Sequence, residues 1–281
     1  MLDSLTIFLI LTAALLHASW HALVKSGTDQ IVVLAGMGLV AAFIALCALP
    51  FVAMPSATVW GIIACSVGLH LGYKLSLARS YAFGDLGQAY PLARGLVPPF
   101  ATMIAFLFLN QTPSVFQMAG ILIVSLGLTW LAVHSIRGGV DQRIFIAATI
   151  AGLAVAGYST VDAYGTRFAG DWMAFTAWLV FIDSGSFFLL IYVFKRNALW
   201  TELWKWRVRT LASGLLGITS FSVFLWALSH SPVGPVSALR EASVLFATLI
   251  GMAFYREPRS WHRIGAVVTI MLGLIVIAVM S

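Results

Sequence analysis

Two arginines stand inside long apolar segments, where a permanent charge is unfavourable. Arg94 lies in Pro91-Leu92-Ala93-Arg94-Gly95, and Arg240 lies in Ser237-Ala238-Leu239-Arg240-Glu241. An arginine at the centre of a membrane span costs about 2.5–3.5 kcal/mol on insertion scales, so such a side chain normally faces a cavity or a partner. The planar guanidinium fork matches a carboxylate, phosphate or phosphonate group. The pair predicts a clamp for an anion; the alternatives are snorkelling toward the interface and pairing with Glu241.

Further ionisable and aromatic side chains in apolar segments are candidates to complete the site. His17 and His21 are four residues apart and therefore share a helix face, with Trp20 beside them. Because histidine titrates near neutral pH, a histidine opposite a carboxylate can take up and release a proton. The predicted substrate-binding residues are Arg94, Arg240, Glu241, Tyr90, His17, His21, Trp20, Tyr158 and Lys74, and the candidates for proton coupling are Asp162, Asp183 and His70.

Two of these residues carry open alternatives. Lys74 shares a face with His70 and Tyr73, so it either adds positive charge to the cavity or snorkels toward Arg79. Asp183 is either the partner of a basic group or the site that binds the coupling proton.

Metal and enzyme chemistry receive little support from the sequence. The His17-x-x-x-His21 spacing lets two imidazoles face one metal ion, but Ala18 stands where a zinc peptidase has glutamate, and no third ligand is near in sequence. No nucleophile has a base at a workable spacing. We therefore expect no metal, no cofactor and no enzymatic activity.

The composition predicts the elements that must hold these residues. The chain of 281 residues is 61% hydrophobic and 9% charged, with a mean hydropathy of +0.98. A span of roughly 20 apolar residues crosses the hydrocarbon layer. We predict an all-α integral membrane protein with ten transmembrane helices, near 5–24, 31–51, 59–80, 87–109, 115–135, 144–166, 173–194, 209–229, 234–255 and 262–280.

The chain also contains an internal repeat. The 146-residue offset between Arg94 and Arg240 also aligns Phe100-Ala101-Thr102 with Phe246-Ala247-Thr248, and Leu126-Gly127-Leu128 with Leu272-Gly273-Leu274. Paired repeats are common in transporters, which hold substrate near the bilayer midplane where the repeats meet. We predict two inverted five-helix repeats, residues 5–135 and 144–280.

Prolines surround both arginines. Pro91, Pro98 and Pro99 lie around Arg94, and Pro232 and Pro235 precede Arg240. Each removes a backbone donor, which predicts kinks or breaks in these helices. For Pro232 and Pro235, starting a helix is an equally good interpretation.

The distribution of basic residues predicts the orientation. Arg167 stands clearly on the side opposite to twelve of the sixteen Lys and Arg residues, which are placed at loops that follow odd-numbered helices: Lys25, Arg79, Arg137, Arg143, Lys195, Arg196, Lys205, Arg207, Arg209, Arg256, Arg259 and Arg263. Basic loops stay cytoplasmic, so both termini are predicted to be periplasmic in a bacterial inner membrane. The net charge of +6 is thus a topology signal, and no nucleic-acid partner is expected.

The motifs resemble those of bacterial EamA-type permeases of the drug/metabolite transporter (DMT) superfamily. The resemblance rests on Gly84-Asp85-Leu86-Gly87-Gln88-Ala89-Tyr90-Pro91-Leu92-Ala93-Arg94 and on Ser231-Pro232-Val233-Gly234-Pro235-Val236-Ser237-Ala238-Leu239-Arg240-Glu241. It covers both halves, 5–135 and 144–280. Glu257 keeps a residue usual in the family's polar turn, whereas the first half has Gln111 there. Family members commonly have cytoplasmic termini, in contrast to the loop charges of this chain.

The resemblance implies a secondary transporter that works by alternating access. Relatives are linked to the export of amino acids and other metabolites, and a similar branch is associated with phosphonate-utilisation genes. We expect a small anionic or zwitterionic substrate of the amino acid, carboxylate or phosphonate type, with possible proton coupling. The expected partners are this solute and the lipid bilayer, and the chain is a monomer or a homodimer. The alternative is a multidrug or lipophilic-cation exporter that uses Glu241, Asp162 or Asp183.

Overall fold

The computed structural model describes residues 2–25, 30–83, 86–134, 142–254 and 260–280, and within these ranges every regular element is a helix. The all-α prediction is confirmed for this part of the chain. The helices are α1 (Ser4–Lys25), α2 (Gln30–Ala48), the 3-10 turn η1 (Leu49–Phe51), α3 (Ala57–Phe83), α4 (Leu86–Leu109), α5 (Val115–His134), α6 (Gln142–Phe168), α7 (Trp172–Lys195), α8 (Asn197–Lys205), α9 (Arg207–His230), α10 (Val233–Arg240), α11 (Ala242–Phe254) and α12 (Trp261–Met280).

The molecule is a multi-pass membrane protein. Among the described residues, nine segments are long and apolar enough to cross a bilayer: Ser4–Val24, Ile31–Phe51, Leu92–Leu109, Val115–His134, Phe145–Phe168, Trp172–Lys195, Arg207–His230, Val233–Met252 and Trp261–Met280. Large apolar side chains such as Phe8, Phe108 and Phe194 are 65%, 76% and 78% exposed. A soluble surface rarely carries so many exposed apolar groups, whereas lipid solvates them. The remaining long helix, α3, is not among the nine, so the ten-span count stays a prediction.

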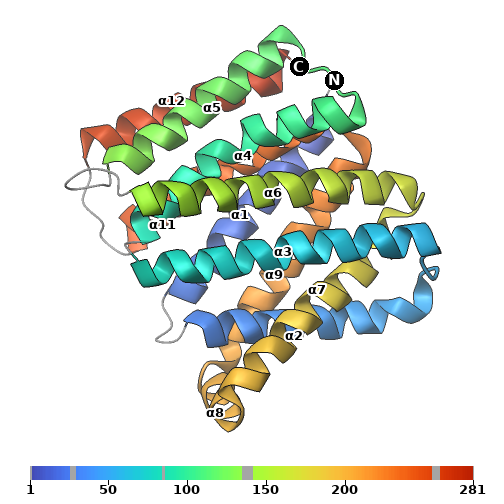
Figure 1. The fold of residues 1–281 in the computed structure, drawn as a ribbon. Helices are drawn as coiled ribbons and strands as arrows, with labels where there is room; N and C mark the ends of the chain where they lie inside the picture. Colours follow the sequence, from blue (N-terminus) through green and yellow to red (C-terminus); the bar gives the residue numbers. More distant parts are fainter. Residues whose placement is uncertain (1, 26–29, 84–85, 135–141, 255–259, 281) are drawn as a thin grey trace.

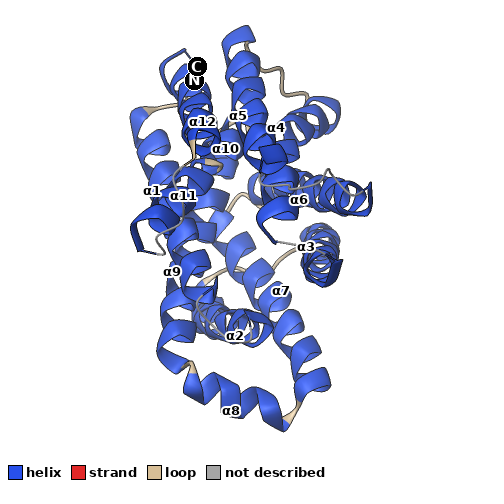
Figure 2. Cartoon of the chain, turned by 90° about the vertical axis from the view of Figure 1, so that its left-hand side faces the viewer, coloured by secondary structure: helices blue, strands red, loops and turns tan. Residues whose placement is uncertain are grey.

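The long helices lie in an antiparallel bundle with both termini at one corner (Figure 1). Helix α5 packs along α12 at one edge, α4 and α3 flank α6, and α2 packs along α7 at the opposite edge. Behind them, α1 packs against α9 and α11. The short helix α8 joins the ends of α7 and α9 at the bottom of the bundle (Figure 2).

One apolar core joins the two halves of the chain. Its fully buried side chains include Ile10 and Ile63 from the first half and Phe175, Phe224 and Ile270 from the second. Since these residues come from α1, α3, α7, α9 and α12, the halves share a core rather than forming separate domains.

Close backbone contact between α5 and α12 depends on glycine. A Cβ atom added at Gly273 would lie 2.8 Å from the carbonyl oxygen of Gly120 and 2.7 Å from the backbone nitrogen of Val124. Small residues allow membrane helices to approach this closely. This seam therefore fixes one edge of the bundle.

The helix that carries Arg240 is interrupted, but not where the prolines stand. Helix α10 ends at Arg240 and α11 begins at Ala242, so the break falls at Glu241. Pro232 is the N-cap of α10 and Pro235 lies in its first turn, which agrees with a role in starting a helix. Helix α4 continues from Leu86 to Leu109 through its three prolines, so it has no break there, and a kink at these prolines stays a prediction.

Candidate functional site

Arg94 and Arg240 line the same internal cavity. Both side chains are buried, with residue exposures of 3% and 7%. The cavity contains about 160 Å³ of space between atoms, none of it wide enough for a water molecule, and is lined by Arg94, Val97, Val155, Ser159, Phe224, Ser237, Arg240 and Glu241. These residues belong to α4, α6, α9 and α10 and to the break that follows α10. In this conformation the cavity is too narrow to hold a solute, so the two arginines are enclosed in the bundle.

Glu241 is the acidic neighbour of this pair. Its side chain is fully buried, and its Oε2 atom lies 3.0 Å from Nε of Arg94. Nη2 of Arg94 also donates to Oγ of Ser243 over 3.4 Å, at the start of α11. The Arg240 guanidinium lies 3.9 Å from the centre of the Phe224 ring, a cation–π contact. The predicted pairing of an arginine with Glu241 is therefore present for Arg94.

The described lining of the cavity contains both basic and acidic side chains. Among the described residues that line it, two guanidinium groups face one carboxylate.

The predicted histidine stripe lies next to the cavity without lining it. The Nε2 atoms of His17 and His21 are 3.2 Å apart, and Trp20 stacks on His21 with a centroid distance of 3.7 Å. Both imidazoles lie within electrostatic range of Arg94 and Arg240. The side chain of Tyr90 lies outside the described residues.

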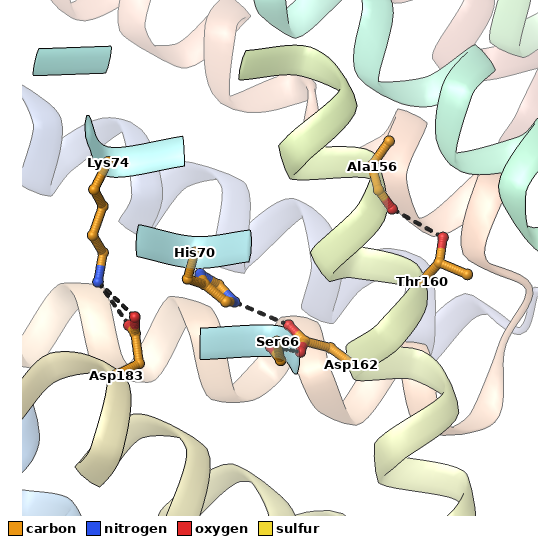
Figure 3. A network of polar contacts seen from close by, with 7 residues as sticks. All are labelled: Ser66, His70, Lys74, Ala156, Thr160, Asp162 and Asp183. Carbon is orange, nitrogen blue, oxygen red and sulfur yellow. Dashed lines mark hydrogen bonds and ion pairs between the residues drawn. The ribbon is translucent and has the colours of Figure 1, made fainter. Parts of the chain in front are cut away.

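A second polar cluster joins α3 to α6 (Figure 3). Asp162 is fully buried; its Oδ1 accepts a hydrogen bond from Ser66 Oγ, and its Oδ2 lies 3.2 Å from His70 Nε2. The Tyr158 ring stacks on His70 with a centroid distance of 3.8 Å. Two of the coupling candidates, His70 and Asp162, thus contact each other.

Lys74 and Asp183 form an ion pair between α3 and α7. The Lys74 Nζ atom lies 2.9 and 2.8 Å from the two carboxylate oxygens of Asp183 (Figure 3). Asp183 is thus the partner of a basic group, one of its two predicted roles. Lys74 is not among the residues that line the arginine cavity, so the structure does not support the alternative in which it adds positive charge there.

The sequence reasoning missed several residues of the cavity wall. Ser159, Ser237, Val97, Val155 and Phe224 carry no charge, and residues of these types are common throughout membrane helices. Ser237 alone had a usable signal, because it falls one turn before Arg240 in the repeated segment. Within the described ranges, no group of three His, Cys, Asp or Glu side chains is arranged to hold a metal ion.

A larger groove opens near the helix ends on the side of the termini. It is lined by Leu9, Ile44, Trp172, Ile218, Thr219, Ser222, Val223 and Trp226, and its empty volume is about 830 Å³, part of it open to the outside. Ser222 and Val223 directly precede Phe224, which lines the arginine cavity. The groove and the cavity therefore lie against the same part of α9.

Comparisons with known proteins identify the family of the second half and the fold of the whole chain. Residues 142–279 match the model of the EamA-like transporter family. No curated protein matches this chain. A solved crystal structure of a protein with 15% sequence identity has a TM-score of 0.79, and the match covers 99% of both chains. At this identity the similarity concerns the fold alone.

Proposed function

Because this chain belongs to the EamA-like transporter family, whose members are DMT-type membrane transporters and not enzymes, we propose that it carries a small anionic or zwitterionic metabolite by alternating access. The single observation behind the substrate class is the burial of Arg94 and Arg240 in one cavity with one carboxylate. The solute is a small amino acid, carboxylate or phosphonate, and its anionic group binds the two guanidinium forks.

The proposed architecture has ten spans in two inverted repeats, with α3 as the tenth span and α10 with α11 as one. The helix contacts support this symmetry. In this arrangement α1, α2, α3, α4 and α5 correspond in turn to α6, α7, α9, α10 with α11, and α12. When each helix is replaced by its counterpart, the contact between α3 and α6 becomes the contact between α9 and α1. The same exchange turns α4 with α6 into α11 with α1, and it leaves the pairs α2 with α7 and α5 with α12 unchanged.

The arginine cavity is the place where these repeats meet. Arg94 comes from the first repeat, whereas Arg240 and Glu241 come from the second. A relative movement of the repeats would separate Arg94 from Glu241 and widen the cavity. The solute anion then takes the position of the Glu241 carboxylate on Arg94, and the groove on α9 provides access from the side of the termini.

The charge of the cavity argues against the alternative of a lipophilic-cation exporter. A cation would meet two guanidinium groups, and the carboxylate in the cavity, Glu241, is already paired with Arg94. Two positive charges in a low-dielectric site strongly repel a third positive charge. We therefore retain the anion carrier as the proposed function.

Binding of three probes to the purified protein in detergent tests this function. Lactate, alanine and methylphosphonate present a carboxylate, a zwitterion and a phosphonate, and binding is measured by calorimetry. Arg94→Ala and Arg240→Ala are expected to weaken binding of the bound probes about 10- to 100-fold, since a hydrogen bond to a charged group contributes about 1.5–3 kcal/mol.

The matched control is Arg207→Ala. Arg207 is exposed, stacks on Trp204 and stands about 25 Å from Phe224 along α9. Its substitution is expected to leave binding unchanged. Unchanged affinity in Arg94→Ala, or an equal loss in Arg207→Ala, would contradict the anion clamp.

A further inference from the structure

Helix α8 lies at the surface of the bilayer because it joins two membrane spans directly. The span of α7 ends at Lys195 and the span of α9 begins at Arg207, and α8 occupies the short interval between them. In Figure 2 the helix α3 is seen nearly end-on, whereas α8 is seen along its length, so α8 runs across the direction of α3. A helix in this place lies in the headgroup region, parallel to the membrane plane.

One face of α8 is fixed to the bundle. Leu199 and Leu203 are buried, and they pack in one apolar cluster with Val32 and Ala35 of α2 and Phe188 of α7. Because the two leucines are four residues apart, they lie on the same face of the helix. This cluster therefore determines where the other faces of α8 point.

A neighbouring face of α8 presents two tryptophans to the outside. Trp200 and Trp204 each follow one of the two buried leucines, and they are 50% and 71% exposed. They are also four residues apart and share a face. Indole rings prefer the interface between membrane and water. The two rings are therefore placed to contact lipid at the level of the headgroups.

Basic side chains lie against the indole rings at the C-terminal end of α8. The Arg207 guanidinium lies 4.8 Å from the centre of the Trp204 ring, and Nζ of Lys205 lies 5.5 Å from the centre of the Trp206 ring. Both basic side chains are exposed. A cation–π contact holds a cation in place without supplying a formal negative charge. The two side chains can therefore bind an anion while they stay on the rings.

The segment from residue 195 to residue 209 carries a strong excess of positive charge. Its single acidic residue is Glu202, and its basic residues are Lys195, Arg196, Lys205, Arg207 and Arg209. Glu202 Oε2 accepts a hydrogen bond from Nε1 of Trp206 over 3.2 Å. Near an anionic bilayer, each Lys or Arg strengthens association about fivefold. The charge of this segment thus complements an acidic membrane surface.

We propose that α8, together with Lys205 and Arg207 at its C-terminal end, is a docking surface for an acidic phospholipid. Trp200 and Trp204 contact the glycerol region and the upper part of the acyl chains, and the two cations bind the oxygens of an anionic headgroup. The spans on both sides of α8 place it among the headgroups, so the ligand comes from the bilayer. A zwitterionic choline headgroup adds a positive charge that the basic segment repels. This inference is independent of the anion clamp.

Lipid preference at α8 is measured with a local reporter. Bimane is attached to Thr201→Cys, on the exposed face of α8, in a Cys47→Ser, Cys65→Ser background, and the protein is reconstituted in phosphatidylcholine vesicles. Part of the lipid is replaced by phosphatidylglycerol or by phosphatidylcholine, each brominated near the glycerol backbone so that it quenches bimane on contact. Phosphatidylglycerol is expected to bind about 5- to 25-fold more strongly, as one or two cations require. Equal quenching by the two lipids would overturn the inference.

Substitutions of single charges locate the binding surface. Lys205→Gln and Arg207→Gln should each reduce the preference about fivefold, and the double variant should show none. Lys205→Arg combined with Arg207→Lys should keep the preference, because it keeps both charges and tests whether substitution alone disturbs α8.

Arg263→Gln is the matched control. Arg263 is partly exposed at the start of α12, at the same end of the bundle, so this variant removes one charge far along the chain from α8. It should keep the full preference at α8. A loss equal to that in Lys205→Gln would mean that lipid responds to overall surface charge, and would overturn the docking surface.

Two other occupants of this surface would give different results. If inorganic phosphate abolished the preference and chloride at equal ionic strength did not, the cations would bind a free anion. If bimane emission followed the ratio of protein to lipid and ignored the brominated lipids, α8 would contact a second copy of this chain. Either result would overturn the lipid surface and leave the anion clamp untouched.

Discussion

At the scale of single residues, Glu241 is the acidic partner of Arg94 when no solute is present. Its carboxylate lies 3.0 Å from Arg94 Nε and is fully buried. Under the proposed function, a solute anion would compete with this internal carboxylate for the same guanidinium. A solute that also carries an ammonium group would give the displaced Glu241 a new partner, so we expect Glu241 to favour zwitterions over simple anions.

Glu241→Gln should therefore reverse the preference between lactate and alanine. Without the internal competitor, lactate is expected to bind about tenfold more tightly, while alanine, which loses its ammonium partner, binds about tenfold more weakly. The measurement is the ratio of the two dissociation constants relative to wild type. If the affinities for both probes fell by the same factor, Glu241 would only maintain the fold of the site.

At the scale of elements, helix ends and glycine seams hold the site. Arg167 donates from Nη2 to the carbonyl oxygens of Leu228 and Ser231 over 2.8 and 2.6 Å, so it satisfies the last turn of α9. This gives a structural reason for a basic residue on the side opposite to most of the others. Gln111 Oε1 accepts from the Val233 backbone N–H over 2.9 Å and ties the start of α10 to the turn after α4.

The seam between α5 and α12 should tolerate no added side chain. In Gly273→Ala the new Cβ meets backbone atoms of Gly120 and Val124, so the helices must separate, with an expected loss of about 1–3 kcal/mol. Thermal unfolding in detergent measures the loss. Gly61→Ala is the control, because a Cβ at Gly61 on α3 meets no atom within 4 Å. Equal stability of the two variants would show that the seam is less tightly packed than described.

At the scale of the whole molecule, the bundle separates basic helix ends from the termini. Lys195, Arg196, Lys205 and Arg207 lie at or beside α8, at the end of the bundle away from both termini. From the positive-inside rule we expect this end in the cytoplasm and the termini in the periplasm. The cytoplasmic termini common in the family would give the opposite orientation. The orientation of this chain therefore tests whether loop charge or family membership predicts its topology.

Cysteine labelling tests the orientation in a Cys47→Ser, Cys65→Ser background. Thr112→Cys lies in the exposed turn between α4 and α5, and Thr201→Cys lies on the exposed face of α8. A membrane-impermeant maleimide applied to intact spheroplasts should label position 112, whereas position 201 should react only after permeabilisation. The reverse pattern would contradict the loop-charge argument.

The sequence by itself determined the features that depend on local composition. Apolar runs have the length of a bilayer crossing, so they predict helices and a membrane without any knowledge of packing. The repeated segments around Arg94 and Arg240 indicated that two arginines lie at equivalent depths, and both are buried beside one cavity. These statements need only the order of residues along one helix at a time.

Only the tertiary structure decided which side chains are partners. Arg94 reaches Ser243 across 149 residues, Lys74 reaches Asp183 across 109, and His70 reaches Asp162 across 92. Each pairing depends on how two helices are rotated and shifted against each other, and in lipid that is set by packing of uncharged surfaces. For this reason the sequence left open whether Lys74 adds charge to the cavity or snorkels toward Arg79, whereas helix packing pairs it with Asp183.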